Sequence, residues 1–346
     1  MSTQGQHSAR RQLSVITVDQ AIAGGSNVLI AVIAARLLDA AGFGLFGIVF
    51  LLYMVAQGVS RALVCDPLLV HPLEAEERKR DVIGTSCMLG LALGAGVVLV
   101  GLAVTLVDTR LGPAVAVMGA FLPLLVLQDL GRYLAYATQR PKSALVLDVT
   151  WLVLLGAAVI PLFVTDTRTL VWLIAAWAGS GAAAGLLTFV QHRAHGVRLG
   201  LSWLRYTWSF SWRYLISYTA TQGGALAAAS AVGAIAGARA LGGLQGAILL
   251  VRPFMTFQIA VIAASVGHVT RSLGAVREIR RYVAGSTALT TAVAAANLAV
   301  LLVLPDSIGR AILGDSWNVA EPLLLATGVQ IVFLGLMTGV RAGLLG

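Results

Sequence analysis

The sequence predicts an all-α polytopic membrane protein with about ten transmembrane helices. Hydrophobic residues make up 58% of the 346 positions and charged residues 11%, whereas soluble domains carry about 25% charged residues. The apolar residues gather in segments of about 20 or more, the length at which a helix crosses a bilayer. The 24 lysines and arginines lie almost entirely between these segments, heavily in every second gap. No soluble core could bury so much apolar surface.

Ten segments meet the length criterion, and the short gaps between several of them require consecutive helices to run antiparallel. The apolar run behind Arg10 and Arg11 is too long for the h-region of a signal peptide, so we expect it to be the first, uncleaved helix. The expected helices cover residues 13–36, 43–70, 82–107, 112–134, 143–164, 169–190, 213–237, 244–268, 282–304 and 319–340.

The basic residues also predict an orientation. Seventeen of the 24, Arg132 among them, lie in one set of gaps, five lie in the alternate set, and Arg61 and Arg252 lie within apolar segments. The excess of positive charge marks the cytoplasmic side. We therefore expect a multi-pass protein of the bacterial inner membrane with both termini in the cytoplasm. The net charge of +9 then reflects loops held near anionic membrane lipids, and no nucleic-acid partner is expected.

The ten helices divide into two lobes. Six helices precede the longest link, after which a pattern recurs: Gln20, Gly44 and Ala35-Arg36 reappear about 202 positions later as Gln222, Gly246 and Ala238-Arg239. Such parallel repeats are known in secondary transporters, where substrate binds between them. We expect a six-helix lobe (1–190), a linker (191–212) and a four-helix lobe (213–346) around a central cavity.

The linker has its own pattern. The stretch GLSWLRYTWSFSW interleaves three tryptophans with Arg205 and Tyr206. Aromatic rings favour the headgroup layer and arginine favours anionic lipid, so this stretch predicts an amphipathic helix on the inner membrane surface. The alternative is an aromatic belt that only anchors the chain.

Arg252 is the most informative polar residue, because a charge inside an apolar segment is costly unless it meets water, a partner or a ligand. Pro253 follows it directly and leaves a backbone carbonyl free, as in the broken helices of transporter sites. Its guanidinium could bind an anionic group through two hydrogen bonds. The alternative is an ion pair with Asp19 or Asp148.

Two other arginines are candidates for substrate binding. Arg61 lies five residues before Asp66, so it could bind substrate, pair with Asp66 or extend to the membrane surface. Arg36 ends the first segment, where it could bind substrate or anchor the helix. Side-chain amides are expected to line a polar lumen or to bond between helices. These amides are Gln20, Asn27, Gln57, Gln128, Gln222 and Gln258.

The sequence offers candidates for ion coupling and no motif of a catalytic site. Four intramembrane aspartates, Asp19, Asp66, Asp129 and Asp148, are candidates to carry a proton or sodium ion, and no cofactor or metal is expected. The sequence has no GxxxxGK[ST] phosphate loop and no HExxH spacing. Its longest loop has 22 residues, too few for a catalytic domain. We expect a transporter rather than an enzyme.

Residues 18–70 resemble the polysaccharide-export flippases of the multidrug/oligosaccharidyl-lipid/polysaccharide exporter superfamily. The matching features are the polar first helix, its closing Ala-Arg-Leu-Leu, the Gly-Phe-Gly-Leu-Phe-Gly that opens the second helix, and the later Arg-Ala-Leu-Val. Over the rest of the chain, the resemblance consists of the lengths and spacing of the expected helices. It implies two six-helix lobes around a cavity, and turnover of polyprenyl-pyrophosphate-linked sugars from the inner to the outer leaflet.

The related lipid II flippases carry functional arginines at the end of the first helix and within the eighth. Arg36 and Arg252 match those places, and Arg61 matches less closely. The family has twelve helices where this chain has ten, so the resemblance implies an incomplete second lobe.

The leading functional hypothesis is a flippase for lipid-linked oligosaccharide in cell-surface polysaccharide synthesis. Membrane lipids, glycosyltransferases and a polysaccharide polymerase would be its partners. One alternative is a drug or metabolite exporter of the same superfamily, which would prefer cations and show carboxylates in its lumen. A second is a scaffold for a glycan assembly complex. A polymerase would need a long outer loop, and the longest outer gap, residues 305–318, is short.

The predicted orientation can be tested with a reporter fused after Arg198. We expect the reporter to show a cytoplasmic location, because this position lies in a strongly basic gap. A fusion after Arg168, in a sparsely charged gap, should report the opposite side, and the reverse pattern would overturn the topology.

Overall fold

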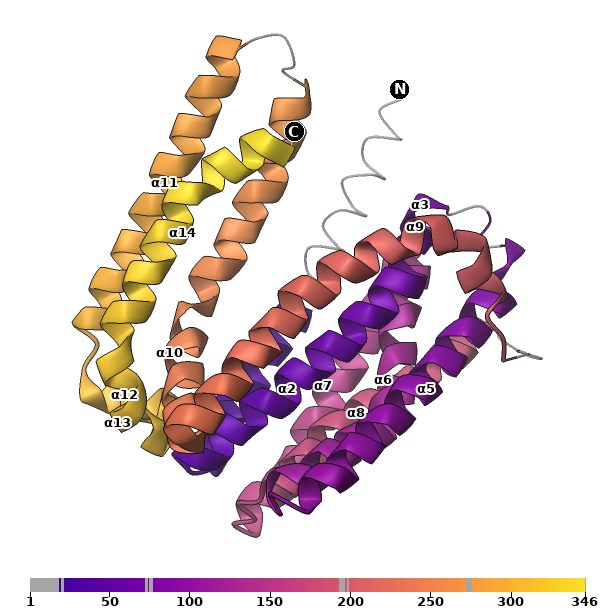
Figure 1. Ribbon diagram of the computed structural model, residues 1–346, viewed down its shortest axis with the longest axis horizontal. Helices are drawn as coiled ribbons and strands as arrows, with labels where there is room; N and C mark the ends of the chain where they lie inside the picture. Colours follow the sequence, from indigo (N-terminus) through magenta and orange to yellow (C-terminus); the bar gives the residue numbers. More distant parts are fainter. Residues whose placement is uncertain are drawn as a thin grey trace. The chain divides into compact units, whose positions relative to one another are not determined.

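The computed structural model describes the chain from Asp19 to Leu345, except for residues 20–21, 72–73, 75–76, 193–196, 198 and 272–275. Gln20 and the expected first helix before residue 19 therefore lie outside the described residues. Every regular element of the described part is a helix (Figure 1). This confirms the predicted all-α class.

The helices follow one another through short connections. In the first half they are an apolar helix at Ile22–Leu37, α2 (Ala40–Ser60), the π-helix η1 (Arg61–Cys65), α3 (Asp66–Val70), α5 (Lys79–Thr105), α6 (Leu111–Ala137), α7 (Pro141–Val164) and α8 (Leu170–Gln191). In the second half they are α9 (Ser202–Tyr218), the π-helix η2 (Thr219–Gly223), α10 (Gly224–Arg271), α11 (Val276–Leu302), α12 (Asp306–Leu313), η3 (Gly314–Ser316), α13 (Trp317–Ala320), η4 (Glu321–Leu323) and α14 (Leu324–Leu345).

Eight helical stretches of the described chain are long and apolar enough to cross a membrane. The longest, Ser202–Met255, is broken at Gly237, whose φ of 84° and ψ of 162° are not helical. Glycine occupies this positive-φ region without the steric cost that other residues meet. With this stretch counted as two helices and the shorter Ile22–Leu37 added, the described apolar helices correspond to the ten expected segments.

The chain forms two compact units. The first comprises Met1–Leu38 and Leu45–Ala236, and the second comprises Asp39–Gly44 and Gly237–Gly346. The division therefore lies at Gly237, and the helix from Ser202 to Ala236 packs with the first unit. Sequence analysis placed the boundary earlier, in the linker at 191–212.

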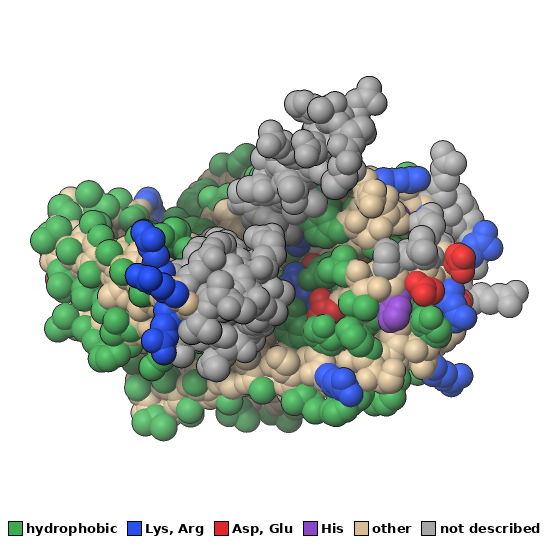
Figure 2. All heavy atoms as spheres, turned by 90° about the horizontal axis from the view of Figure 1, so that it is seen from above, with side chains coloured by type: hydrophobic (Ala, Val, Ile, Leu, Met, Phe, Trp, Pro, Cys, Tyr) green, Lys and Arg blue, Asp and Glu red, His purple; other side chains and the backbone are tan. Residues whose placement is uncertain are grey.

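Helix α6 is the centre of the first unit, because it packs against α5, α7 and α8. Just over half of the most apolar window of α6 is buried, against 17% for α5 and 28% for α7. Large apolar side chains on those two outer helices, including Leu99, Leu102, Val153 and Ile160, are more than half exposed. Hydrophobic side chains also cover much of the surface in Figure 2. These faces suit contact with lipid tails.

The segment from Ser202 combines a buried face with an exposed one. Trp203 is fully buried, and its indole Nε1 donates a hydrogen bond of 3.2 Å to Val64 O. Trp208 and Trp212 are 51% and 41% exposed. The aromatic pattern of the sequence thus contains one residue that anchors α9 to the neighbouring helix and two that face outward.

The second unit has a smaller core, in which α11 packs along α14. Val251 and Phe254 of α10 contact Ala294 of α11 and Ile331 of α14. Hydrogen bonds add to this packing, since Gln258 Nε2 donates to Leu334 O at 2.7 Å and to Thr338 Oγ1 at 2.8 Å.

Helices α5 and α6 approach closely through glycine. A Cβ atom added at Gly101 would lie 2.4 Å from the backbone N of Ala116, a contact that no side-chain rotation could relieve. Gly96, on the same helix, has open space at that position. Small residues allow this kind of close approach in membrane helix pairs.

We therefore expect Gly101→Ala to destabilise the protein by about 1–3 kcal/mol, since it overpacks a backbone contact. Gly96→Ala is the matched control and should be neutral or slightly stabilising, because alanine favours a helix over glycine. Thermal unfolding in detergent would measure both. Equal unfolding temperatures for the two variants would contradict the packing argument.

Candidate functional site

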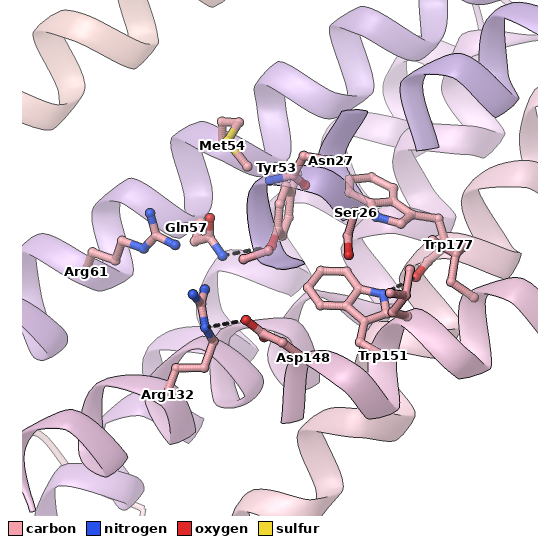
Figure 3. A pocket seen from close by; sticks show the side chains of 13 residues that line it. Ser26, Asn27, Tyr53, Met54, Gln57, Arg61, Arg132, Asp148, Trp151 and Trp177 are labelled. Atoms are coloured by element: carbon pink, nitrogen blue, oxygen red, sulfur yellow. Dashed lines mark hydrogen bonds and ion pairs between the residues drawn. The ribbon is translucent and has the colours of Figure 1, made fainter. Parts of the chain in front are cut away.

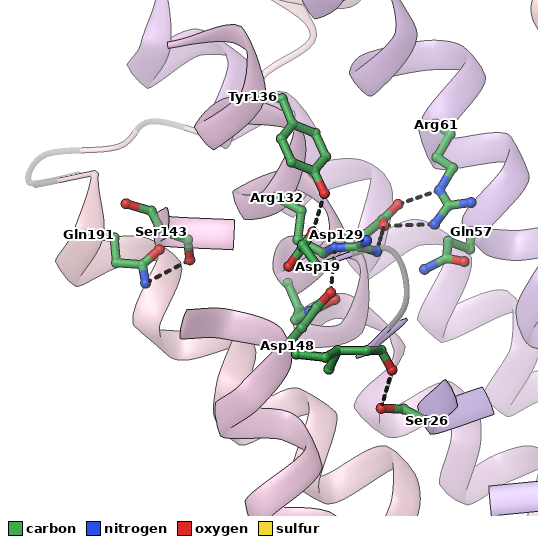
Figure 4. A network of polar contacts seen from close by, with 12 residues as sticks. Asp19, Ser26, Gln57, Arg61, Asp129, Arg132, Tyr136, Ser143, Asp148 and Gln191 are labelled. Carbon is green, nitrogen blue, oxygen red and sulfur yellow. Dashed lines mark hydrogen bonds and ion pairs between the residues drawn. The ribbon is translucent and has the colours of Figure 1, made fainter. Parts of the chain in front are cut away.

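Five ionisable side chains meet inside the first unit (Figure 4). They come from four parts of the chain that are far apart in sequence, and their members are Asp19, Arg61, Asp129, Arg132 and Asp148. All three aspartates are at most 4% exposed. At this depth a charge is costly unless it is paired, so the five groups depend on one another.

The shortest ion pair joins Arg61 and Asp129. Arg61 Nε donates to Asp129 Oδ2 at 2.7 Å and Arg61 Nη2 donates to Asp129 Oδ1 at 2.8 Å. This two-point geometry is the strongest form of arginine–carboxylate contact. The sequence suggested Asp66 as a partner for Arg61, and the structure instead shows Asp129, which lies 68 positions away.

Arg132 lies at the centre of the network and is 8% exposed. Its Nε is 3.1 Å from Asp148 Oδ2, its Nη1 is 3.5 Å from Asp129 Oδ1, and its Nη2 is 3.6 Å from Asp19 Oδ2. Sequence analysis counted Arg132 among the cytoplasmic loop charges, and this was wrong. Asp129 and Arg132 are spaced i,i+3 on α6, a spacing that places them on one helix face and could have indicated the pair.

Neutral side chains complete the network. Gln128 Nε2 donates to Asp148 Oδ1 at 2.8 Å, and the Tyr136 hydroxyl donates to Asp19 Oδ2. Asp19 Oδ1 is buried and has no hydrogen-bond partner among the described residues. Three carboxylates therefore share two guanidinium groups, which leaves one formal negative charge in excess when all are ionised.

A cavity of about 470 Å³, counted with its open mouth, adjoins this network (Figure 3). Arg61, Arg132 and Asp148 reach its wall on one side. Aromatic rings form another part of the wall, with the rings of Tyr53 and Trp177 5.1 Å apart and edge-on. Its lining residues are Ala23, Ser26, Asn27, Tyr53, Met54, Gln57, Arg61, Arg132, Asp148, Trp151, Leu152, Leu155 and Trp177.

Some of the residues predicted from sequence come together here. Arg61, Asn27, Gln57 and Asp148 line the cavity, and Gln57 Nε2 donates to the Tyr53 hydroxyl at 2.7 Å. Asp19 and Asp129 belong to the network behind them. Sequence analysis did not predict the aromatic residues of the cavity wall, because an aromatic residue in an apolar segment is indistinguishable from an ordinary packing residue.

Other predicted residues lie elsewhere. Asp66 is half-buried at the start of α3, and Gln222 lies in the π-helix η2. Arg36 is exposed near the end of its helix. Arg252, half-buried, and Gln258 belong to the second unit. Among the described residues, no group of three or more His, Cys, Asp or Glu side chains is arranged to hold a metal ion.

Apolar helices of membrane length, arranged in two compact units with a charged cavity inside one of them, define the class of the protein as a multi-pass membrane protein. Its structure is similar to that of a multidrug resistance MATE family transporter of the MOP superfamily in an inward-facing conformation. The identity is 15%, the TM-score is 0.68, and the match covers 92% of this chain and 81% of the other.

It is also similar to a MOP superfamily transporter from Pyrococcus furiosus Vc1 (DSM3638), whose binding pocket is described as reversed in polarity. Here the identity is 13%, the TM-score is 0.54, and the match covers 97% of this chain and 83% of the other. No protein-family model and no curated protein matches the sequence. The chain therefore has the fold of MOP superfamily transporters.

The charge network makes a sharp prediction for stability. We expect Arg132→Gln to destabilise the first unit by about 3–5 kcal/mol, since it leaves buried carboxylates without their partner. The added change Asp148→Asn should recover part of this loss, because it removes one unpaired charge.

Arg168→Gln is the control, since Arg168 pairs with Asp166 at 2.7 Å on an exposed surface. Such surface pairs contribute about 0–1 kcal/mol. Thermal unfolding in one detergent would compare the three variants. If Arg132→Gln and Arg168→Gln unfolded at the same temperature, the network would not be stabilising.

Proposed function

We propose that this protein is a membrane exporter that binds amphipathic organic cations in the cavity of its first unit. The observation that carries this proposal is the combination of excess negative charge and aromatic walls around one cavity. A cation gains from nearby carboxylates and also from the faces of Trp and Tyr rings. The similarity in fold to MOP superfamily transporters supports export by alternating access.

The same geometry disfavours a pyrophosphate in this cavity. Arg61 already directs Nε and Nη2 at the two oxygens of Asp129, so one of the two sides on which its guanidinium could bind a phosphate is occupied. Arg132 is surrounded by three aspartates. An anion placed here would meet three carboxylates against two guanidinium groups, and like charges repel.

Asp148 is the carboxylate that we assign to ion coupling. It is part of the cavity wall, while Asp129 lies behind it with both oxygens bound by Arg61. A group that exchanges a proton or a sodium ion needs a path to water, and the cavity provides one. Asp19 and Asp129 would then hold Arg132 and Arg61 in place while Asp148 changes its occupancy.

A second candidate function, the turnover of lipid-linked oligosaccharide, is favoured by Arg252. This arginine lies in an apolar helix of the second unit, is half-buried, and is followed by Pro253. An arginine in this setting is suited to a phosphate group. Glycosyltransferases and a polysaccharide polymerase would be partners under this candidate.

Transport by reconstituted protein would test the first proposal. We expect proteoliposomes with an imposed proton or sodium gradient to transport ethidium, a planar aromatic cation, and Asp148→Asn to reduce the rate at least about tenfold, the factor that a lost charge contact of 1.4 kcal/mol produces. Asp166→Asn, on the exposed surface, is the control. Equal rates for the two variants would remove Asp148 from the mechanism, and a lack of ethidium transport by the unmodified protein would overturn the cation proposal.

The second candidate has its own measurement, in which vesicles receive a fluorescent polyprenyl-pyrophosphate sugar. Turnover of this lipid that is lost in Arg252→Ala, with normal folding, would favour the flippase. Turnover unaffected by Arg252→Ala would exclude a pyrophosphate contact at that residue.

A further inference from the structure

The helix that carries Arg61 is widened at this residue. Helix α2 passes into the π-helix Arg61–Cys65, and the backbone N–H of Asp66 bonds to Arg61 O, five positions back. Pro67 follows directly and has no N–H, so Leu63 O lacks the donor that a regular α-helix would supply. Single π-turns of this kind occur often at functional sites.

Helix α9 supplies donors to this widened turn. Trp203 Nε1 lies 3.2 Å from Val64 O, and Ser211 Oγ lies 3.4 Å from Leu63 O. Ser211 Oγ is also 3.1 Å from both Thr207 O and Thr207 Oγ1, so its single proton has three competing acceptors. The Trp203 indole can only donate, and both side chains are fully buried. Trp203 therefore provides the more definite contact.

The widened turn sets the direction of Arg61. Each residue of an α-helix turns the chain by about 100°. If the π-turn became a regular α-helix, the register would change by one residue. The helical segment before the turn would then rotate relative to the segment after it by about 100°. Arg61 is the first residue of the π-turn, and its side chain contacts Asp129 while the turn is π-helical. A rotation of this size would separate the two groups.

A second π-turn lies on the helix that holds the first. Helix α9 continues into Thr219–Gly223, and Tyr218, just before it, contacts the α2 helix, since a Cβ atom at Gly58 would lie 3.1 Å from the Tyr218 ring. Each of the two neighbouring helices thus has a π-turn close to the Gly58–Tyr218 contact.

We propose that Trp203 is a positioning residue that holds the π-turn of residues 61–65 open and so keeps Arg61 on Asp129. Through this contact the position of α9 controls the charge that the cavity presents to its cation, so the inference rests on the proposed function. Trp203 itself is not part of the cavity lining and acts through Arg61.

Hydrogen exchange tests the inference without requiring transport. In Trp203→Phe, which keeps an aromatic ring but lacks the N–H, we expect amide exchange in the peptide 61–70 to rise roughly three- to tenfold, as the loss of one buried hydrogen bond would produce. Exchange in α8 should stay unchanged. Trp208→Phe, on the exposed face of the same helix, is the matched control and should leave peptide 61–70 as it is. If Trp203→Phe does not fold, benzothienylalanine at 203 keeps the indole shape and removes the N–H.

A binding cycle then separates positioning from simple packing. Ethidium affinity is measured for Trp203→Phe, Arg61→Gln and the double variant. If Trp203 acts through Arg61, its replacement changes affinity in the parent chain and has no further effect beside Arg61→Gln. Equal effects in both backgrounds, or unchanged exchange in peptide 61–70, would overturn the inference. Changed exchange in a protein that does not bind ethidium would sustain the Trp203 contact and refute the proposed function alone.

Discussion

The mutual neutralisation of buried charges is the constraint on which the first unit depends. Asp129 and Arg132 both project from α6, and their partners Arg61, Asp148 and Asp19 come from other helical segments. Removing one partner of a buried ion pair leaves the other charge buried and unpaired. This loss of free energy is larger than the net stabilisation that the intact pair contributes. The four segments are thus held in one arrangement by electrostatics as well as by packing, and α6, the central helix of the packing, also carries two members of the network.

This arrangement also makes the cavity chemically specific. Arginines next to a membrane cavity suggest an anionic ligand when they are considered alone. Here three carboxylates contact the two guanidinium groups, so the site is net negative when all five groups are ionised, opposite in sign to its arginines. Trp151 and Trp177 add a surface that favours flat or cationic groups over free phosphate. The partner of each charge, more than its presence, decides what the site can bind.

The fold class could be predicted from sequence because hydrophobicity over about 20 residues has a direct physical meaning in a bilayer. The charge network could be predicted only in part. Asp19, Asp129 and Asp148 were recognised as intramembrane carboxylates, but the pairing of Arg61 with Asp129 joins residues 68 positions apart and has no local signature. Arg132 was counted with the loop charges because it lies only two positions before the expected end of its helix at residue 134, whereas α6 continues to Ala137 and keeps this charge inside the bundle. The break at Gly237 was also hidden, because glycine is abundant throughout the chain.

The distance along the chain between Arg61 and Asp129 has a consequence for how the protein is made. Ribosomes add roughly 5–20 residues per second, so Arg61 is synthesised several seconds before the carboxylate that neutralises it. An arginine at the centre of an inserting helix costs about 2.5–3.5 kcal/mol. Before α6 is inserted, only the apolar residues around Arg61, in a stretch of mean hydropathy 1.9, offset this free-energy cost. Asp129 and Arg132 enter together on one helix face, so α6 inserts with its charges already paired. The order of helices in the chain thus leaves Arg61 without Asp129 until α6 has been made.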